Sequence, residues 1–270
     1  MIRVDLPRRI QNSSILRQIG LIMTADKSLG QNWLKNREIL DEIAELADNG
    51  EVKLCVEIGP GLGTLTASLL RHFEKVIAVE FDSKLAENLP KSFPGKNLEV
   101  VNEDILKYDF ESLGEPYMVA GNIPYYITSP IIKKVLEVRN RPVRVVLLMQ
   151  KEVAERILDE KETMLSLFVK NYARVFAGPV VRKGEFTPQP KVDSQVIVME
   201  PFVQPIVDEK VFDLIRKGFL APRKKLAHNL AGLMSREELM KVFRACDIPE
   251  DARPGDVSLE KWGKLYKKIM

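Results

Sequence analysis

Hydrophobic and polar positions follow two alternating periods along residues 37–150. Segments with apolar residues at helical spacing alternate with short, nearly continuous apolar runs that are typical of buried strands. The predicted helices are REILDEIAELA (37–47), GTLTASLLRHF (63–73), SKLAENLPKSF (83–93) and SPIIKKVLEV (129–138), and the predicted strands are VKLCVEIG (52–59), KVIAVEF (75–81), NLEVVNED (97–104), PYMVAGN (116–122) and VRVVLLMQ (143–150). This alternation predicts an α/β fold, in which a parallel sheet has helices on both faces.

The pattern after residue 150 is less regular and indicates a second, smaller domain. Two helical stretches come first, and two strand-like segments follow that we expect to pair antiparallel at the sheet edge. These four segments are 150–159, 162–176, VVRKGEF (180–186) and KVDSQVIVMEP (191–201). Because only helical periods occur from residue 208 to 268, we predict an α/β domain over residues 1–204 and a helical domain over residues 205–270.

Positive charge is concentrated toward the two ends of the chain. Residues 1–37 hold seven Lys and Arg against two Asp, and residues 205–270 hold fourteen against ten acids. The residues between them carry −6 within a net charge of +3 for the whole chain. Two basic ends suit a polyanionic partner such as nucleic acid, although ordinary solvated helix faces explain the charge alone equally well.

The composition narrows the class of protein. With 45% hydrophobic and 29% charged residues, the chain suits a globular protein of one large domain, or one large and one small domain. No apolar run is long enough to span a membrane, and the N-terminal segment lacks the apolar core of a signal peptide, so we expect a cytoplasmic protein. Cys55 and Cys246 fit no metal-ligand spacing and are expected to be packing residues, with no metal site.

Glycines follow the first predicted strand and lead into a helix. The segment VEIGPGLGTLT (56–66) places Gly59, Gly61 and Gly63 at this turn. Glycine lets the backbone approach a ligand closely at a helix N-terminus. Alone, such a turn is a weak indication of a ligand site.

Polar side chains stand at the ends of three further strands. Glu80 closes VIAVE and can accept both hydroxyl hydrogens of a ribose, Asp104 in VNEDIL can accept from an adenine amino group, and Asn122 ends VAGN. Ligands of open α/β sheets bind outside the carboxyl ends of the strands. Each acid taken singly also suits a helix cap or an exposed loop, but the ordered series indicates a nucleoside-binding site.

The spacing of the glycines distinguishes between two classes of cofactor. Dinucleotide-binding enzymes space their glycines G-x-G-x-x-G, whereas this chain has G-x-G-x-G, with Thr64 where the last glycine of that fingerprint would stand. A turn without a pyrophosphate to bind suits a ligand with an amino-acid tail, whose adenosine Glu80 and Asp104 would hold. S-adenosylmethionine is such a ligand.

The segment GNIPYY (121–126) suits methylation of an adenine amine. That amine is a poor nucleophile because its lone pair is delocalised into the ring, so two acceptors must hold its hydrogens and turn the lone pair toward the methyl group. The side-chain oxygen of Asn122 and the backbone carbonyl of Ile123 are predicted to be these acceptors. Pro124 would fix the turn, and Tyr125 would stack on the base, so that catalysis is mostly orientation.

These motifs resemble those of the ribosomal RNA adenine N6,N6-dimethyltransferases of the KsgA type, with the Erm methyltransferases as related enzymes. The resemblance covers nearly the whole chain, and its motifs in this order are highly specific. They are SLGQNWLKN (28–36), VEIGPGLGTLT (56–66), VIAVE (76–80), NEDIL (102–106), GNIPYYITSPII (121–132), LLMQKEVAERI (147–157) and FTPQPKVDSQVIV (186–198).

The resemblance implies a Rossmann-like S-adenosylmethionine-dependent methyltransferase fold with a small C-terminal all-helical domain. It implies that Tyr125 and Phe186 are the two aromatic faces that clamp an adenine taken out of its stack, although Phe186 as a core aromatic is the alternative. Tyr126 departs from the family, where Asn is common at its position. The cofactor contacts that the resemblance implies fall on Asn32, Leu34, Gly59, Glu80, Asp104 and Asn122.

Two groups of cations are candidate RNA contacts. Arg223, Lys224 and Lys225 precede a predicted helix, which is an unfavourable place for cations in a helix dipole unless an anion lies nearby. Lys183 and Lys191 flank Phe186 in sequence and are close enough to meet phosphates. A solvated charge run remains an equal explanation for the first group.

The sequence therefore predicts an S-adenosylmethionine-dependent enzyme that dimethylates N6 of two adjacent adenosines near the 3′ end of 16S rRNA within the small ribosomal subunit, with a role in subunit biogenesis. A monomer is expected. The alternatives are an Erm-type enzyme acting on 23S rRNA and a mainly non-catalytic assembly factor. A small-molecule methyltransferase would leave the basic ends and the helical domain without a use.

Overall fold

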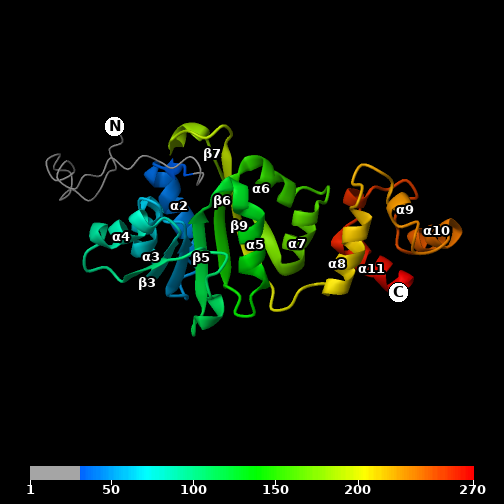
Figure 1. The fold of residues 1–270 in the computed structure, drawn as a ribbon, viewed down its shortest axis with the longest axis horizontal. Helices are drawn as coiled ribbons and strands as arrows, with labels where there is room; N and C mark the ends of the chain where they lie inside the picture. The colour runs from blue at the N-terminus through cyan, green and yellow to red at the C-terminus, as the bar shows by residue number, and fades with distance from the viewer. Residues whose placement is uncertain (1–30) are drawn as a thin grey trace. The chain divides into compact units, whose positions relative to one another are not determined.

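The computed structural model describes residues 31–270, and its main sheet has seven strands (Figure 1). Most of the basic N-terminal segment, residues 1–30, lies outside the described residues. The strand order is β4-β3-β2-β5-β6-β9-β7, and β1 and β8 form a separate two-stranded sheet. The strands are β1 (Trp33–Leu34), β2 (Leu54–Ile58), β3 (Lys75–Glu80), β4 (Leu98–Asn102), β5 (Tyr117–Asn122), β6 (Arg144–Gln150), β7 (Ala173–Val181), β8 (Phe186–Thr187) and β9 (Ser194–Pro201).

The strands β4, β3, β2, β5 and β6 are parallel, as the alternation of apolar runs and helical periods predicts. Their order places the ends of β2, β3 and β5 side by side. The helices that connect and follow the strands are α2 (Arg37–Ala47), α3 (Thr64–His72), α4 (Ser83–Ser92), α5 (Thr128–Glu137), α6 (Lys151–Leu158) and α7 (Met164–Tyr172).

Both faces of the sheet are buried at its central strands. Successive side chains of a strand point to opposite faces, and β2 is buried at every position. Cys55 of β2 packs in one apolar cluster with Leu40 of α2 and Leu69 of α3, while its neighbour Val56 is buried on the opposite face. The continuous apolar runs of the sequence therefore reflect two covered faces. Cys55 and Cys246 are both free and buried, so the prediction that they are packing residues is confirmed.

The predicted pairing of the last two strands is confirmed, but the first of them begins earlier than expected. Gly178 lies against Val196, and the N–H of Phe202 donates to the carbonyl of Tyr172, so β7 and β9 run antiparallel. The prediction of a strand over residues 180–186 was wrong, because β7 occupies Ala173–Val181. Pro179 interrupts the sequence pattern but is tolerated because β7 is an edge strand.

The chain divides into two compact units. One contains residues 31–151 and 177–198 of the described chain, and the other contains residues 152–176 and 199–270. The helices that the sequence predicts after residue 208 are present and share the second unit with most of α6 and with α7. They are α8 (Glu209–Gly218), α9 (Leu226–Asn229), α10 (Arg236–Ala245) and α11 (Leu259–Ile269).

The second unit has its own apolar core. Phe168 of α7 contacts Phe212 of α8 edge to face, and the fully buried Trp262 of α11 packs where a side chain on Gly218 would stand. Nearby, the buried carboxylate of Glu162 accepts hydrogen bonds from Lys170 at 2.9 Å and from Ser166 at 2.7 Å. The helical period after residue 208 therefore reflects burial within this unit.

Candidate active site

Two adjoining hollows open at the carboxyl ends of the parallel strands. The inner hollow, of about 60 Å³, is lined by Asn32, Trp33, Gly61, Asn122 and Tyr125 among others. The outer hollow, of about 240 Å³, includes Glu80, Phe81, Asp104 and Tyr126 in its lining. Gln31, Gly59 and Pro124 line both, so the two hollows form one elongated site.

All three glycines of the predicted turn adopt left-handed backbone conformations. Their φ angles are +63° at Gly59, +56° at Gly61 and +81° at Gly63. A Cβ on Gly61 would lie 2.9 Å from the indole nitrogen of Trp33 in the inner hollow. A Cβ on Gly63 would lie 2.7 Å from Leu89 of α4, and Gly63 lines neither hollow. Gly59 and Gly61 thus shape the ligand site, whereas Gly63 allows close packing of α3 against α4.

Glu80 connects the end of β3 to the glycine turn. Glu80 is 6% exposed, and its carboxylate accepts hydrogen bonds from the N–H of Gly61 at 2.9 Å and of Asp82 at 2.8 Å. Burial raises the pKa of Glu80, and these backbone donors act in the opposite direction. Because a carboxylate offers about four acceptor positions, these backbone donors leave Glu80, which lines the outer hollow, with capacity to accept from a ligand.

Glu57 is a second buried carboxyl group beside the turn, and sequence reasoning did not include it among the site residues. It lines the inner hollow, is 1% exposed and accepts a hydrogen bond of 2.6 Å from the hydroxyl of Thr66. Burial, with a smaller contribution from the charge of Glu80, raises the pKa of Glu57 to about 8. The one available signal was a charged residue inside an otherwise apolar strand.

Asp104 begins a turn at the far side of the outer hollow. Its side chain accepts a hydrogen bond from the N–H of Leu106 at 3.0 Å, which holds the carboxylate at the edge of the hollow. The structure thus places Asp104 and Glu80 in the lining of the same hollow, as the order of strand ends predicts.

The amide of Asn122 has a defined orientation at the end of β5. Its Nδ2 donates a 2.8 Å hydrogen bond to the backbone carbonyl of Asn32. A carbonyl can only accept, so the amide nitrogen faces Asn32 and the side-chain oxygen is left as an acceptor. Ile123 is 1% exposed, and its N–H bonds to the carbonyl of Leu148 in β6. These contacts fix the backbone before Pro124.

Tyr125 is held at its hydroxyl end. Its hydroxyl lies 2.7 Å from the hydroxyl of Ser194, a fully buried residue at the start of β9. Burial raises the pKa of Tyr125, so the phenol is neutral at physiological pH. Tyr125 lines the inner hollow, and its predicted role in stacking on the base stays a prediction. Sequence reasoning did not find Ser194, because no local pattern links it to Tyr125.

Phe186 and Leu34 lie in the two-stranded sheet. Leu34 pairs with Phe186, and Trp33 pairs with Thr187. Leu34 lines the inner hollow, but Phe186 is 2% exposed and belongs to the apolar cluster of the first unit. The structure therefore gives Phe186 a place in the core, and its predicted stacking role stays a prediction.

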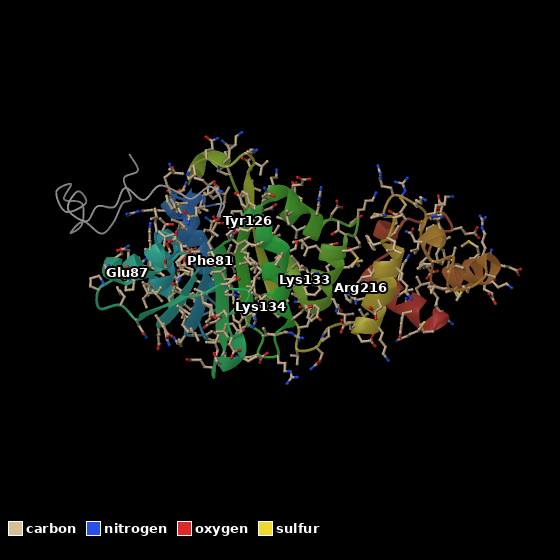
Figure 2. The ribbon with its side chains drawn as sticks, viewed as in Figure 1. Phe81, Glu87, Tyr126, Lys133, Lys134 and Arg216 are labelled. Carbon is tan, nitrogen blue, oxygen red and sulfur yellow. The ribbon has the colours of Figure 1, made fainter. Side chains whose placement is uncertain are left out.

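Phe81 and Tyr126 are two further aromatic residues of the outer hollow (Figure 2). Phe81 is 64% exposed and Tyr126 is 62% exposed. Neither was among the predicted site residues, although Phe81 directly follows Glu80. The sequence does not reveal their exposure, whereas the structure does, and large exposed aromatic side chains indicate a binding surface.

The predicted cationic residues are all exposed. Lys183 and Lys191 lie on the segment between β7 and β9, whose ends are joined by a hydrogen bond from the N–H of Lys183 to Asp193 at 2.9 Å. In the second unit, Arg223, Lys224 and Lys225 precede α9, as predicted.

Over residues 31–270, no group of His, Cys, Asp or Glu is arranged to hold a metal ion. Within the same part of the chain, no helix has the length and apolar character needed to cross a membrane.

The chain is similar to known proteins over most of its length. The family model described as ribosomal RNA adenine dimethylase matches residues 22–270. A protein from Clostridium acetobutylicum named ribosomal RNA small subunit methyltransferase A is 39% identical over 256 residues, which is 90% of this chain and 93% of the relative. A protein of the same name from Bacillus pumilus is 36% identical and covers 97% of this chain and 96% of its own.

Solved structures share the fold. The crystal structure of the 23S rRNA methyltransferase ErmE has a TM-score of 0.74 at 25% identity and covers 88% of this chain and 99% of its own. A dimethyladenosine transferase from Plasmodium falciparum has a TM-score of 0.72 at 29% identity, with coverage of 86% and 95%. The predicted Rossmann-like methyltransferase fold is therefore confirmed.

Proposed function

Because this chain belongs to the ribosomal RNA adenine dimethylase family, we propose that it transfers methyl groups from S-adenosylmethionine to N6 of adenine in ribosomal RNA. Its targets are two adjacent adenosines near the 3′ end of small-subunit 16S rRNA, and the modification contributes to subunit biogenesis. The observation that carries this proposal is the Asn122 amide, whose orientation by Asn32 leaves an oxygen acceptor beside the glycine turn.

The elongated site fits the cofactor in two parts. In the outer hollow, the Glu80 carboxylate accepts from the ribose hydroxyls, and Asp104 accepts from the adenine amino group. The inner hollow, where Gly59 and Gly61 expose the backbone, receives the amino-acid tail. When bound, the cofactor supplies an electrophilic methyl group on a sulfonium. Leu34 and the backbone at Asn32 complete the inner contacts.

Residues of the GNIPYY segment orient the acceptor. The side-chain oxygen of Asn122 and the carbonyl of Ile123 accept the two hydrogens of the adenine amine and direct its lone pair toward the methyl group. The amine becomes cationic and acidic as the new N–C bond forms, so its proton passes to water without a strong base. Pro124 keeps the two acceptors in a fixed turn, and the burial of Ile123 holds them in place.

Aromatic stacking holds the target base. Tyr125 presents its ring in the inner hollow with its hydroxyl anchored on Ser194, which restricts the ring to one orientation. Phe186 provides the second face after its ring turns out of the apolar cluster. A base taken out of its stack has both faces free for such contacts.

The partner is rRNA within the small ribosomal subunit. Arg223, Lys224 and Lys225 in the helical domain of residues 205–270 bind backbone phosphates, and Lys183 and Lys191 bind phosphates next to the target. The enzyme acts as a cytoplasmic monomer without a metal ion. Relatives named small subunit methyltransferase favour this target over 23S rRNA, although ErmE shares the fold.

In vitro methylation of undermethylated small and large ribosomal subunits tests the proposal. Tritiated methyl transfer should occur on the small subunit, and mapping should place two dimethylated adenosines near the 3′ end of its rRNA. Transfer only to the large subunit would favour the Erm-type activity. Binding to the small subunit without any transfer would favour an assembly factor.

A further inference from the structure

The two-stranded sheet of β1 and β8 joins the cofactor side of the site to the base side. On the cofactor side, β1 carries Trp33 against Gly61 and follows Asn32, whose carbonyl holds the Asn122 amide. On the other strand, β8 begins with Phe186, the residue proposed to stack on the target base. The pairing of Leu34 with Phe186 therefore fixes how the backbones of these two segments are aligned.

The sheet is too short to fix its own register. Each strand has two residues, and only two pairs define the alignment. A shift of one residue turns every side chain to the opposite face of a strand. Such a shift would move Phe186 away from Leu34 and out of its present position. An additional contact is needed to hold one alignment.

Asn36 and Glu185 supply contacts directly beside the paired residues. Nδ2 of Asn36 donates a 3.1 Å hydrogen bond to Oε2 of Glu185, and the N–H of Lys35 donates a 3.0 Å bond to the backbone carbonyl of Glu185. The other end of the Asn36 amide is also used, because Oδ1 caps α2 by accepting from the N–H groups of Glu38 and Ile39. Asn36 thus ties β8 to the start of a helix that is packed in the core.

We propose that the hydrogen bond between Asn36 and Glu185 is a register lock that keeps the backbone of Phe186 aligned with Leu34, a residue of the inner hollow, for methyl transfer. Both residues are positioning residues, since neither lines either hollow. This inference rests on the proposed function, because it assigns the lock to the rRNA reaction. The lock acts on the adenine side, so its loss lowers kcat on the small subunit and leaves cofactor affinity unchanged.

Because an amide can donate a hydrogen bond and a carboxylate can only accept one, the bond can be tested by exchanging the side-chain types at positions 36 and 185. Asn36→Asp keeps the helix cap, because Asp caps as well as Asn, but it removes the donor and places a second carboxylate against Glu185. Glu185→Gln keeps an acceptor oxygen for Asn36. In the double variant, the amide introduced at position 185 would donate to the carboxylate introduced at position 36, which restores the bond with donor and acceptor exchanged.

The wild type, the two single variants and the double variant are compared. The measurements are kcat on undermethylated small subunits, calorimetric affinity for S-adenosylmethionine and melting temperature. Deuterium uptake of segments 33–36 and 185–187 is measured without substrate. Asn36→Asp should lower kcat by about tenfold and raise uptake in both segments, as expected for a small displacement of a reacting partner. Glu185→Gln and the double variant should stay within about threefold of wild type, given one preserved hydrogen bond.

Two results would overturn the lock. One is wild-type kcat in Asn36→Asp, and the other is a double variant as slow as Asn36→Asp. An inactive wild-type protein would instead count against the proposed function, and the deuterium uptake would then still decide whether the bond holds the register.

Discussion

The side-chain amide of Asn122 donates to the backbone carbonyl of Asn32 across 90 positions of the chain, with an N···O distance of 2.8 Å. This bond joins the end of β5 to the residue before β1, and it decides which end of the amide is left to accept. Substitution of Asn122 by Ala removes one of two proposed acceptors and the hydrogen bond from Asn122 to the Asn32 carbonyl.

The Asn122→Ala variant should lose about two to three orders of magnitude in kcat, as when one preorganised hydrogen-bonding group is removed at a developing charge. Binding to the small subunit should change little. Rates must be compared with both substrates saturating, and cofactor affinity measured in parallel, because Asn122 also lines the cofactor side of the inner hollow. Near wild-type kcat would show that GNIPYY is only a structural turn.

Glu80→Ala should weaken S-adenosylmethionine binding by about 1.5 to 3 kcal/mol, the range for hydrogen bonds to a charged group. The measurement is titration calorimetry. Glu103→Ala is the matched control, since Glu103 lines the same outer hollow but has no proposed contact with the ribose. An equal loss in the two variants would indicate a general effect of charge and would remove the specific role of Glu80.

Glu57 makes stability depend on pH. Its pKa is about 8 in the folded protein against an ordinary value of 4.5, so the folded state holds a proton that the unfolded state has released between these values. The free energy of unfolding should therefore fall as pH rises from 4.5 to 8, by up to about 1.4 kcal/mol per pH unit from this group. Glu57→Gln, which stays neutral and can still accept from Thr66, should flatten this slope.

Urea unfolding at pH 5 and pH 8 measures the effect, with Glu103→Gln as the control for loss of a carboxylate near the site. A slope in Glu57→Gln as steep as that of wild type would mean that Glu57 is ionised in the folded protein throughout this range.

The Phe186→Leu variant distinguishes a packing role of Phe186 in the core from a stacking role on the adenine. Leu retains much of the apolar volume, so the free energy of unfolding should fall by less than about 1.5 kcal/mol. If the ring stacks on the adenine, kcat on the small subunit should still fall about tenfold, because an aromatic stacking contact on a base is worth about 1 to 3 kcal/mol. Unchanged kcat with reduced stability would assign Phe186 to the core alone.

Replacement of Arg223, Lys224 and Lys225 together with Ala should reduce the salt dependence of small-subunit binding. Each phosphate contact contributes about −0.9 to the logarithmic salt slope on duplex and about −0.7 on single strands. A matched triple variant replaces Arg216, Lys241 and Lys264, which form ion pairs with acids of their own helices. Equal slopes in the two triple variants would support a solvated face around Arg223.

Much of the fold could be predicted from residues that are close together in the sequence. The predicted helix over residues 37–47 coincides with α2, because its apolar period is a local signal. Glycines at 59, 61 and 63 predict a turn because only glycine adopts positive φ readily, and all three do so. The strand order along the chain likewise places Glu80 and Asp104 at one edge, and both line the outer hollow.

The alternation of strands and helices, the glycine turn, the polar strand ends and the resemblance of motifs could all be predicted, because each depends on residues that are neighbours in the chain. Contacts between residues far apart in the sequence could not be predicted in this way. The bond from Asn122 to Asn32, the anchor of Tyr125 on Ser194 and the burial of Phe186 span many positions and have no local period. The raised pKa of Glu57 has the same origin, since desolvation depends on everything that surrounds a side chain in space.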